Sequence, residues 1–166
     1  LQQGQLEEAA ALLGQAERIL PRSADWYHLA GVLHLQRQQP AEALPFFEQA
    51  LRLVPQHAQA WNNRGVAFAR LGQPAQAEAC HRRAAEIEPG RIDFTRNLAG
   101  CLQALGRHSE AIAILRPLVT RAAAITNDRF ALAVSLGATG QHAEAQSIYR
   151  SILDAEPTYW QAAVNY

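Results

Sequence analysis

Small and apolar residues recur along this chain at a fixed step of 34 positions, with no insertion between one occurrence and the next. The clearest column consists of alanines: Ala9, Ala43, Ala77, Ala111 and Ala145. A proline column keeps the same register at Pro21, Pro55, Pro89 and Pro157, and Ala123 is its one exception. A constant period of this length is the signature of a repeat protein in which each unit packs on its neighbours.

Each 34-residue unit carries two stretches with helical periodicity. In residues 58–91, Trp61, Gly65 and Phe68 follow one another at steps of four and three, so they share one face of a first helix. Ala77, His81 and Ala84 form the inward stripe of a second helix. The unit therefore predicts a pair of amphipathic helices.

Glycine and proline mark the ends of these helices. Gly72 is expected to end the first helix, because glycine adopts the left-handed conformation of a C-terminal cap at little cost. Pro74 then begins the second helix at a position where the missing N–H is not needed, and Pro89 ends it. Small residues predict close crossing of the paired helices, with Gly31 facing Ala43 and Gly65 facing Ala77.

These residues resemble the tetratricopeptide repeat, a 34-residue unit with a W-x2-L-G-x2-Y…A-x3-F…P pattern. The matching positions in residues 58–91 are Trp61, Arg64, Gly65, Phe68, Ala77, His81, Ala84 and Pro89. The resemblance implies an all-α fold, a right-handed superhelical solenoid of antiparallel helix pairs. It implies a single array over residues 1–166. The full repeats would be 24–57, 58–91, 92–125 and 126–159, after the second helix of a truncated repeat (1–23) and before the start of another first helix (160–166).

Composition and charge argue against two classes of partner. The 15 basic and 15 acidic residues cancel, whereas a nucleic-acid or anionic-membrane binder normally carries a clustered basic excess. We therefore expect neither nucleic acid nor an anionic membrane as a partner. No stretch of about 18 apolar residues is free of charged or strongly polar groups, so direct membrane insertion is not expected. Ala, Leu, Gln, Glu and Arg dominate the chain, and they are strong helix formers.

The sequence offers little catalytic chemistry. None of its six histidines and two cysteines has the i, i+4 or CxxC spacing typical of a metal site. His81 falls in the inward column, where a hydrogen-bonded core histidine is expected. Neither a nucleophile elbow nor a glycine-rich phosphate loop is present. We therefore expect no enzyme activity, no cofactor and no metal.

With no catalytic or metal site expected, we expect the chain to act through a binding surface. The resemblance implies that the first helices of the repeats line a concave groove. The expected ligand-binding residues are His28, Gln59, Asn62, Asn63, Arg96, Asn97, Asn127 and Asn165. The column Asn63, Asn97 and Asn165 resembles the asparagine ladder of O-linked N-acetylglucosamine transferase repeats, although Leu29 and Ala131 interrupt it. An amide suits this role because it donates to a peptide C=O and accepts from a peptide N–H. Arg96 beside the column would add a preference for an acidic residue in the ligand.

The leading hypothesis is a non-catalytic module that binds a protein or peptide in this groove. The alternatives are a substrate-recruiting arm of a larger enzyme, such as a glycosyltransferase, and a scaffold in bacterial envelope or secretion assembly. The chain has no Met or Lys, and the parent protein is expected to continue in both directions. The truncated repeat ends are predicted to fray or to self-associate. The sequence leaves the compartment open between cytoplasm and periplasm.

Overall fold

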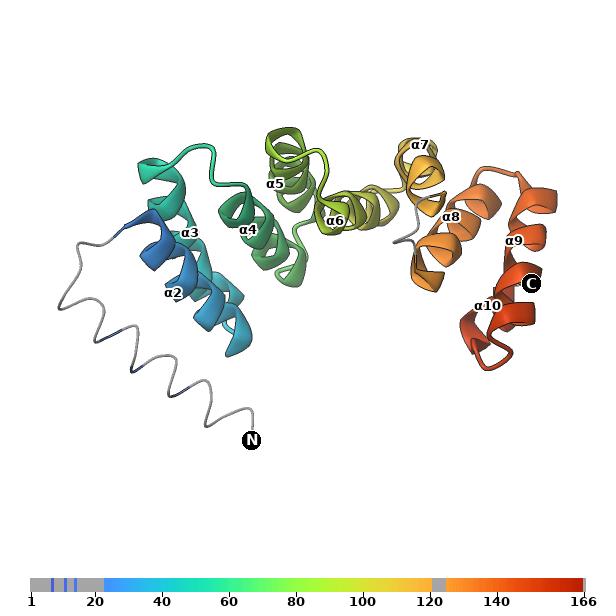
Figure 1. The fold of residues 1–166 in the computed structure, drawn as a ribbon, viewed down its shortest axis with the longest axis horizontal. Helices are drawn as coiled ribbons and strands as arrows, with labels where there is room; N and C mark the ends of the chain where they lie inside the picture. The colour runs from blue at the N-terminus through green and yellow to red at the C-terminus, as the bar shows by residue number, and fades with distance from the viewer. Residues whose placement is uncertain (1–6, 8–10, 12–13, 15–22, 121–124, 166) are drawn as a thin grey trace. The chain divides into compact units, whose positions relative to one another are not determined.

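The computed structural model describes residues 23–120 and 125–165, together with Glu7, Ala11 and Gly14. All regular secondary structure in these residues is α-helical, which confirms the predicted fold class (Figure 1). The helices are α2 (Ala24–Gln36), α3 (Pro40–Leu53), α4 (Ala58–Arg70), α5 (Pro74–Ile87), α6 (Ile92–Ala104), α7 (His108–Val119), α8 (Thr126–Ala138), α9 (His142–Ala155) and α10 (Trp160–Asn165). The helix predicted within residues 1–23 lies outside the described residues.

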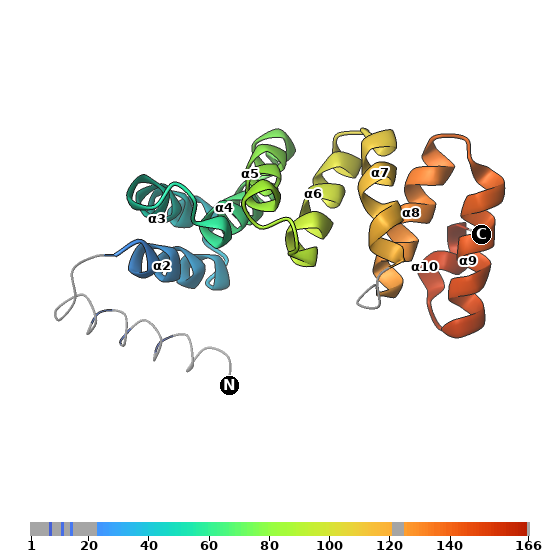
Figure 2. The same ribbon diagram turned by 45° about the horizontal axis from the view of Figure 1, so that its top comes forward.

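The helices follow the order predicted by the 34-residue period. A first helix and a second helix alternate, and α2 packs against α3, α4 against α5, and α8 against α9 (Figures 1 and 2). The chain forms two compact units, unit 1 (Leu1–Phe94) and unit 2 (Thr95–Tyr166), which are described separately. Among the described helices, none combines the length and apolar character of a transmembrane span.

The turns between paired helices depend on one left-handed residue in each repeat. Gly72, Gly106 and Gly140 have φ values of 71°, 71° and 81°. Gln38 holds the same place in the first repeat with φ 61°, a conformation that is uncommon for a residue with a side chain. The next helices begin soon afterwards, and Pro40 and Pro74 stand in the first turns of α3 and α5.

The alanine column is buried where the helices of a pair meet. Ala43, Ala77, Ala111 and Ala145 are all inaccessible or nearly so. In unit 1, Ala43 packs with Phe47 and Leu35 of the same repeat and with Ala67 of α4, so the core continues from one helix pair to the next. This continuity is the property expected of stacked repeats.

Gly31 and Gly65, which lie in first helices of unit 1, face aromatic rings, which corrects the prediction that they face alanines. A Cβ atom added to Gly31 would lie 2.6 Å from the Phe47 ring, and one added to Gly65 would lie 2.7 Å from the His81 ring. The ring lies against the first helix, and only a residue without a side chain leaves room for it. Glycine is therefore required here by packing and not by backbone conformation.

Candidate functional site

The first-helix face of unit 1 consists of Asp25 and His28 on α2, His57 at the start of α4, and Gln59 and Asn63 on α4. The amide of Asn63 donates from Nδ2 to Nε2 of His28 over 2.9 Å. This bond requires an unprotonated Nε2, so the neutral His28 ring carries its proton on Nδ1. Both side chains are half-buried, and Gln59 is exposed. The structure thus joins two of the predicted ligand-binding residues, His28 and Asn63, in one hydrogen-bonded pair.

His57 fixes the neighbouring part of this face. Its Nδ1 accepts the backbone N–H of Ala60 over 3.3 Å and caps α4, which leaves the proton on Nε2. Nε2–H donates to Oδ1 of Asp25 over 3.2 Å. The rings of His28 and His57 lie 4.9 Å apart between centroids. Burial lowers the pKa of His28, and a positive charge on His57 would lower it further, while Asp25 acts in the opposite direction.

Asn62 does not belong to this face, which corrects its assignment as a groove residue. It is 8% exposed, and its Oδ1 accepts from Nδ1 of His81 over 3.0 Å. One residue step turns a helix by about 100°, so Asn62 points toward α5 while Asn63 points toward α2. The buried, hydrogen-bonded state of His81 confirms the prediction of a core histidine. Burial lowers the pKa of His81 to about 4 and keeps the ring neutral near pH 7.

In unit 2, Arg96 is already neutralised by a carboxylate. Its Nε and Nη2 donate to the two oxygens of Asp128 over 2.7 and 2.8 Å. Asp128 is 3% exposed and also accepts the backbone N–H of Ile125 over 3.0 Å. Burial alone would raise the pKa of Asp128, but hydrogen bonds from Arg96 and Ile125 outweigh it and hold the pKa below its usual value. The expectation that Arg96 selects an acidic ligand is therefore not supported.

The remaining predicted asparagines take separate roles. Asn97 is half-buried on α6. Asn127 is exposed, and its Oδ1 accepts from the Tyr159 hydroxyl over 2.6 Å. Asn165 donates from Nδ2 to the backbone oxygen of Gln161 over 2.7 Å. In unit 2 the structure therefore shows individual amides with different partners.

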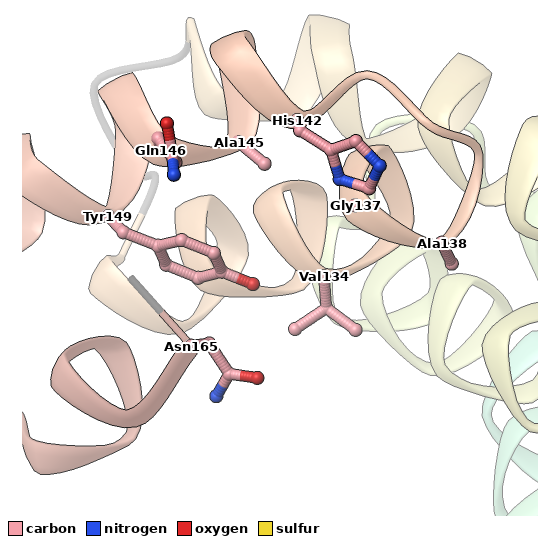
Figure 3. A pocket seen from close by; sticks show the side chains of 8 residues that line it. All are labelled: Val134, Gly137, Ala138, His142, Ala145, Gln146, Tyr149 and Asn165. Atoms are coloured by element: carbon pink, nitrogen blue, oxygen red, sulfur yellow. The ribbon is translucent and has the colours of Figure 1, made fainter.

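A pocket of about 370 Å³ lies between α8, α9 and α10 (Figure 3). Its lining residues are Val134, Gly137, Ala138, His142, Ala145, Gln146, Tyr149 and Asn165. Of the predicted ligand-binding residues, Asn165 belongs to it. One feature of the sequence, which the groove prediction did not consider, indicates this pocket. Gln146 and Tyr149 carry polar groups at the positions that Leu44 and Phe47 occupy in the first full repeat.

The described part of the chain brings no three His, Cys, Asp or Glu side chains together as a metal site would require. Cys80 and Cys101 are both buried, and neither forms a disulfide. Within the first-helix face of unit 1, Asn63 instead bonds to His28, and His57 bonds to Asp25.

Sequence models of one family match most of the chain. Models described as tetratricopeptide repeat match residues 1–56 and 28–92, residues 68–134, and residues 129–151. No curated protein matches the chain by sequence.

Several solved structures superpose well on this fold. The structure of YrrB, described as a TPR protein with an unusual peptide-binding site, has a TM-score of 0.83 at 21% identity, covering 96% of this chain and 82% of its own. A structure of the MamA protein has a TM-score of 0.80 at 16% identity, covering 96% and 87%. MamA from Desulfovibrio magneticus RS-1 has a TM-score of 0.79 at 19% identity, covering 84% and 78%. At these identities the likeness concerns the fold alone. Together with the family models that match more than half of its length, it shows that this chain belongs to the tetratricopeptide repeat family.

Proposed function

We propose that this chain is a non-catalytic protein-interaction module that binds an extended peptide on the first-helix face of unit 1. The observation that carries the proposal is the Asn63 amide. It is half-buried and oriented on both sides, since Nδ2 donates to His28 over 2.9 Å and Oδ1 accepts from Asn62 over 3.4 Å. An amide held in this way is ready to bind without losing further side-chain freedom.

Asn63 retains hydrogen-bonding capacity beyond these two contacts. A side-chain amide has two N–H donors and two acceptor positions on its oxygen, and the bonds to His28 and Asn62 use one of each. One donor and one acceptor remain for a ligand. A peptide backbone presents the complementary C=O and N–H whatever its sequence, so an extended peptide suits this amide.

The Arg96 cation, which was expected to select an acidic ligand, lies in unit 2 and is ion-paired with Asp128, so it has little free energy to gain from an ionic ligand. In the first-helix face of unit 1, the carboxylate of Asp25 accepts a hydrogen bond from Nε2–H of His57 over 3.2 Å. These contacts favour a ligand recognised through its backbone. The peptide-binding site named for YrrB, whose fold this chain shares, is a further reason to propose a peptide ligand.

The test begins with a random peptide library displayed on phage and selected against the full chain. The tightest selected peptide is then titrated against the wild type and against Asn63→Ala. Two lost hydrogen bonds of about 0.5–1.5 kcal/mol each correspond to a loss of affinity of about five- to a hundredfold. Circular dichroism should show an unchanged helical content, since alanine is a stronger helix former than asparagine.

Gln76→Ala is the matched control, because it removes an exposed amide from α5, the second helix of the same repeat. Its affinity should equal that of the wild type. If Asn63→Ala and Gln76→Ala bind the selected peptide equally well, the first-helix face of unit 1 is not the binding surface.

A further inference from the structure

A row of hydrogen-bonded side chains leads from the core of unit 1 to its first-helix face. Nδ1 of His81 donates to Oδ1 of Asn62 over 3.0 Å, and Nδ2 of Asn62 donates to Oδ1 of Asn63 over 3.4 Å. Nδ2 of Asn63 then donates to Nε2 of His28 over 2.9 Å. Each amide accepts on one side and donates on the other, so all three bonds point toward His28. The row therefore fixes on which side the Asn63 amide presents its oxygen and on which side its nitrogen.

The direction of this row depends on the protonation state of its last member. Nε2 of His28 accepts from Asn63 only while it carries no proton. A protonated ring has an N–H group on both nitrogens, and its Nε2–H would then meet the N–H group of Asn63. A half turn of the amide removes this conflict, because it exchanges the oxygen and the nitrogen. The turned amide accepts from the cationic ring, and such a charge-assisted bond is stronger than the neutral bond it replaces.

Asn63 is the member of the row that can turn at the least cost. Its bond to Asn62 is the longest of the three, at 3.4 Å, and lies beyond the usual range for N–H···O bonds. Asn62 is buried, and its oxygen is held by the equally buried His81 over 3.0 Å. A turn of Asn63 therefore gives up a weak bond to Asn62 and gains a strong one to protonated His28.

The surroundings of His28 determine when it takes up a proton. Of the described residues, Asp25 on the same helix and His57 at the start of α4 are the titratable groups that act on it. From α3 it meets the Phe47 ring, 6.1 Å away between centroids. Burial lowers the pKa of His28, and a charge on His57 lowers it further, while Asp25 raises it. The net change is downward, so the ring is neutral near pH 7 and becomes protonated only below pH 6.5.

We propose that His28 is a positioning residue for Asn63, and that protonation of His28 turns the Asn63 amide over and releases a bound peptide in mild acid. The part that concerns the peptide rests on the proposed function. Near pH 7 a peptide C=O faces the remaining N–H of Asn63, and a peptide N–H faces its oxygen. After the turn, donor faces donor and acceptor faces acceptor. The peptide should then lose both bonds, which is the loss expected for Asn63→Ala.

The first test follows the side chains without a peptide. Imidazole and side-chain amide signals of the ¹⁵N-labelled full chain are recorded from pH 7.5 to pH 4.5, and the backbone amide signals verify the fold at each pH. At pH 7.5 the His28 ring should carry its proton on Nδ1, and nuclear Overhauser effects should connect it to the Asn63 NH2 protons. These effects should weaken with the midpoint of the His28 titration, because the amide oxygen then faces the ring. Effects of full strength in the protonated state would overturn the proposal.

The second test measures the consequence for binding. A phage-selected peptide without Asp, Glu or His and with blocked termini is used, so that any pH dependence comes from the chain. Its affinity for the wild type should fall about five- to a hundredfold, with the midpoint of the His28 titration. In His28→Gln the affinity should be independent of pH, because the glutamine oxygen accepts from Asn63 and does not titrate. His34→Gln is the matched control on α2, since His34 bonds to Gln39 and lies outside the row, and it should respond as the wild type does.

The outcomes distinguish a failure of this proposal from a failure of the proposed function. If Asn63→Ala binds the peptide as tightly as the wild type at pH 7.5, the proposed function is wrong, and the spectra recorded without peptide still decide whether Asn63 turns. If Asn63→Ala weakens binding but the wild type binds equally well at pH 7.5 and pH 4.5, His28 does not control the amide. A loss of affinity in acid that persists in His28→Gln would overturn the proposal as well.

Discussion

A histidine sits where this repeat normally places a large apolar side chain, and its environment decides its protonation state. His81 is 2% exposed, packs on Gly65, and donates from Nδ1 to Oδ1 of Asn62. Neither partner compensates a positive charge. Desolvation therefore dominates and lowers its pKa to about 4, whereas an unfolded histidine titrates near 6.5.

This shift predicts a loss of stability in mild acid. Between pH 6.5 and pH 4 the unfolded chain takes up a proton at this histidine and the folded chain does not, so the free energy of unfolding falls as the pH falls. The contribution of His81 is complete above pH 6.5 and decreases by about 3 kcal/mol on the way to pH 4. Urea denaturation of the wild type and His81→Phe at both pH values measures it.

Phenylalanine cannot titrate, so the stability of His81→Phe should depend less on pH over this range. His28, whose pKa is also lowered, is present in both proteins, and its effect cancels in the comparison. Equal losses of stability in the two proteins between pH 6.5 and pH 4 would show that His81 titrates in the folded chain as it does in the unfolded chain.

At the scale of the helix, replacing glycine by alanine at two positions in first helices is expected to have opposite effects on stability. Gly65 in α4 supports the His81 ring, and an added Cβ would lie 2.7 Å from it. Gly100 in α6 is exposed, and nothing lies within 4 Å of an added Cβ. Alanine in a helix interior is favoured over glycine by about 0.5–1 kcal/mol, but overpacking a tight site costs about 1–3 kcal/mol.

Gly100→Ala should therefore raise the melting temperature and Gly65→Ala should lower it. The buried ring of His81 cannot move aside without breaking its hydrogen bond to Asn62, so the overpacking term exceeds the gain in helix propensity. Thermal denaturation followed by circular dichroism measures both. A Gly65→Ala variant as stable as Gly100→Ala would mean that α4 and α5 do not approach as closely as the structure shows.

The helices were predictable from the sequence because their determinants are local. Gly72 and Pro74 mark a helix end and a helix start through their own backbone preferences, and the structure places both as expected. The residues that lie opposite Gly31 and Gly65 were not predictable in the same way. The column spacing identifies which residues point inward. It does not show which inward side chain fills the space opposite a glycine, because this depends on the size of each side chain. The rings of Phe47 and His81 reach farther than the alanine side chains.

At the scale of the whole chain, the period predicted the repeat family, but it did not predict which polar side chains bond to one another. Asn63 and His28, both predicted ligand-binding residues, bond to each other. Asn62 was misplaced because a period alone does not reveal that His81 needs a hydrogen-bond partner. Arg96 was misread because its partner, Asp128, comes from the next repeat, 32 residues away in sequence. Such contacts between repeats depend on rotamers that a one-dimensional pattern does not contain.

We expect the first-helix face of unit 1, and not the second helices, to receive the peptide. The most direct measurement uses a phage-selected peptide carrying a nitroxide, bound to the ¹⁵N-labelled full chain. Paramagnetic broadening should be strongest for the side-chain amide of Asn63 and for backbone amides of α2 and α4 around His28. It should be weak along the exposed side of α5 around Gln76. Broadening centred on α3 and α5, with the Asn63 signals unchanged, would show that the peptide lies on the second helices and not on the first-helix face of unit 1.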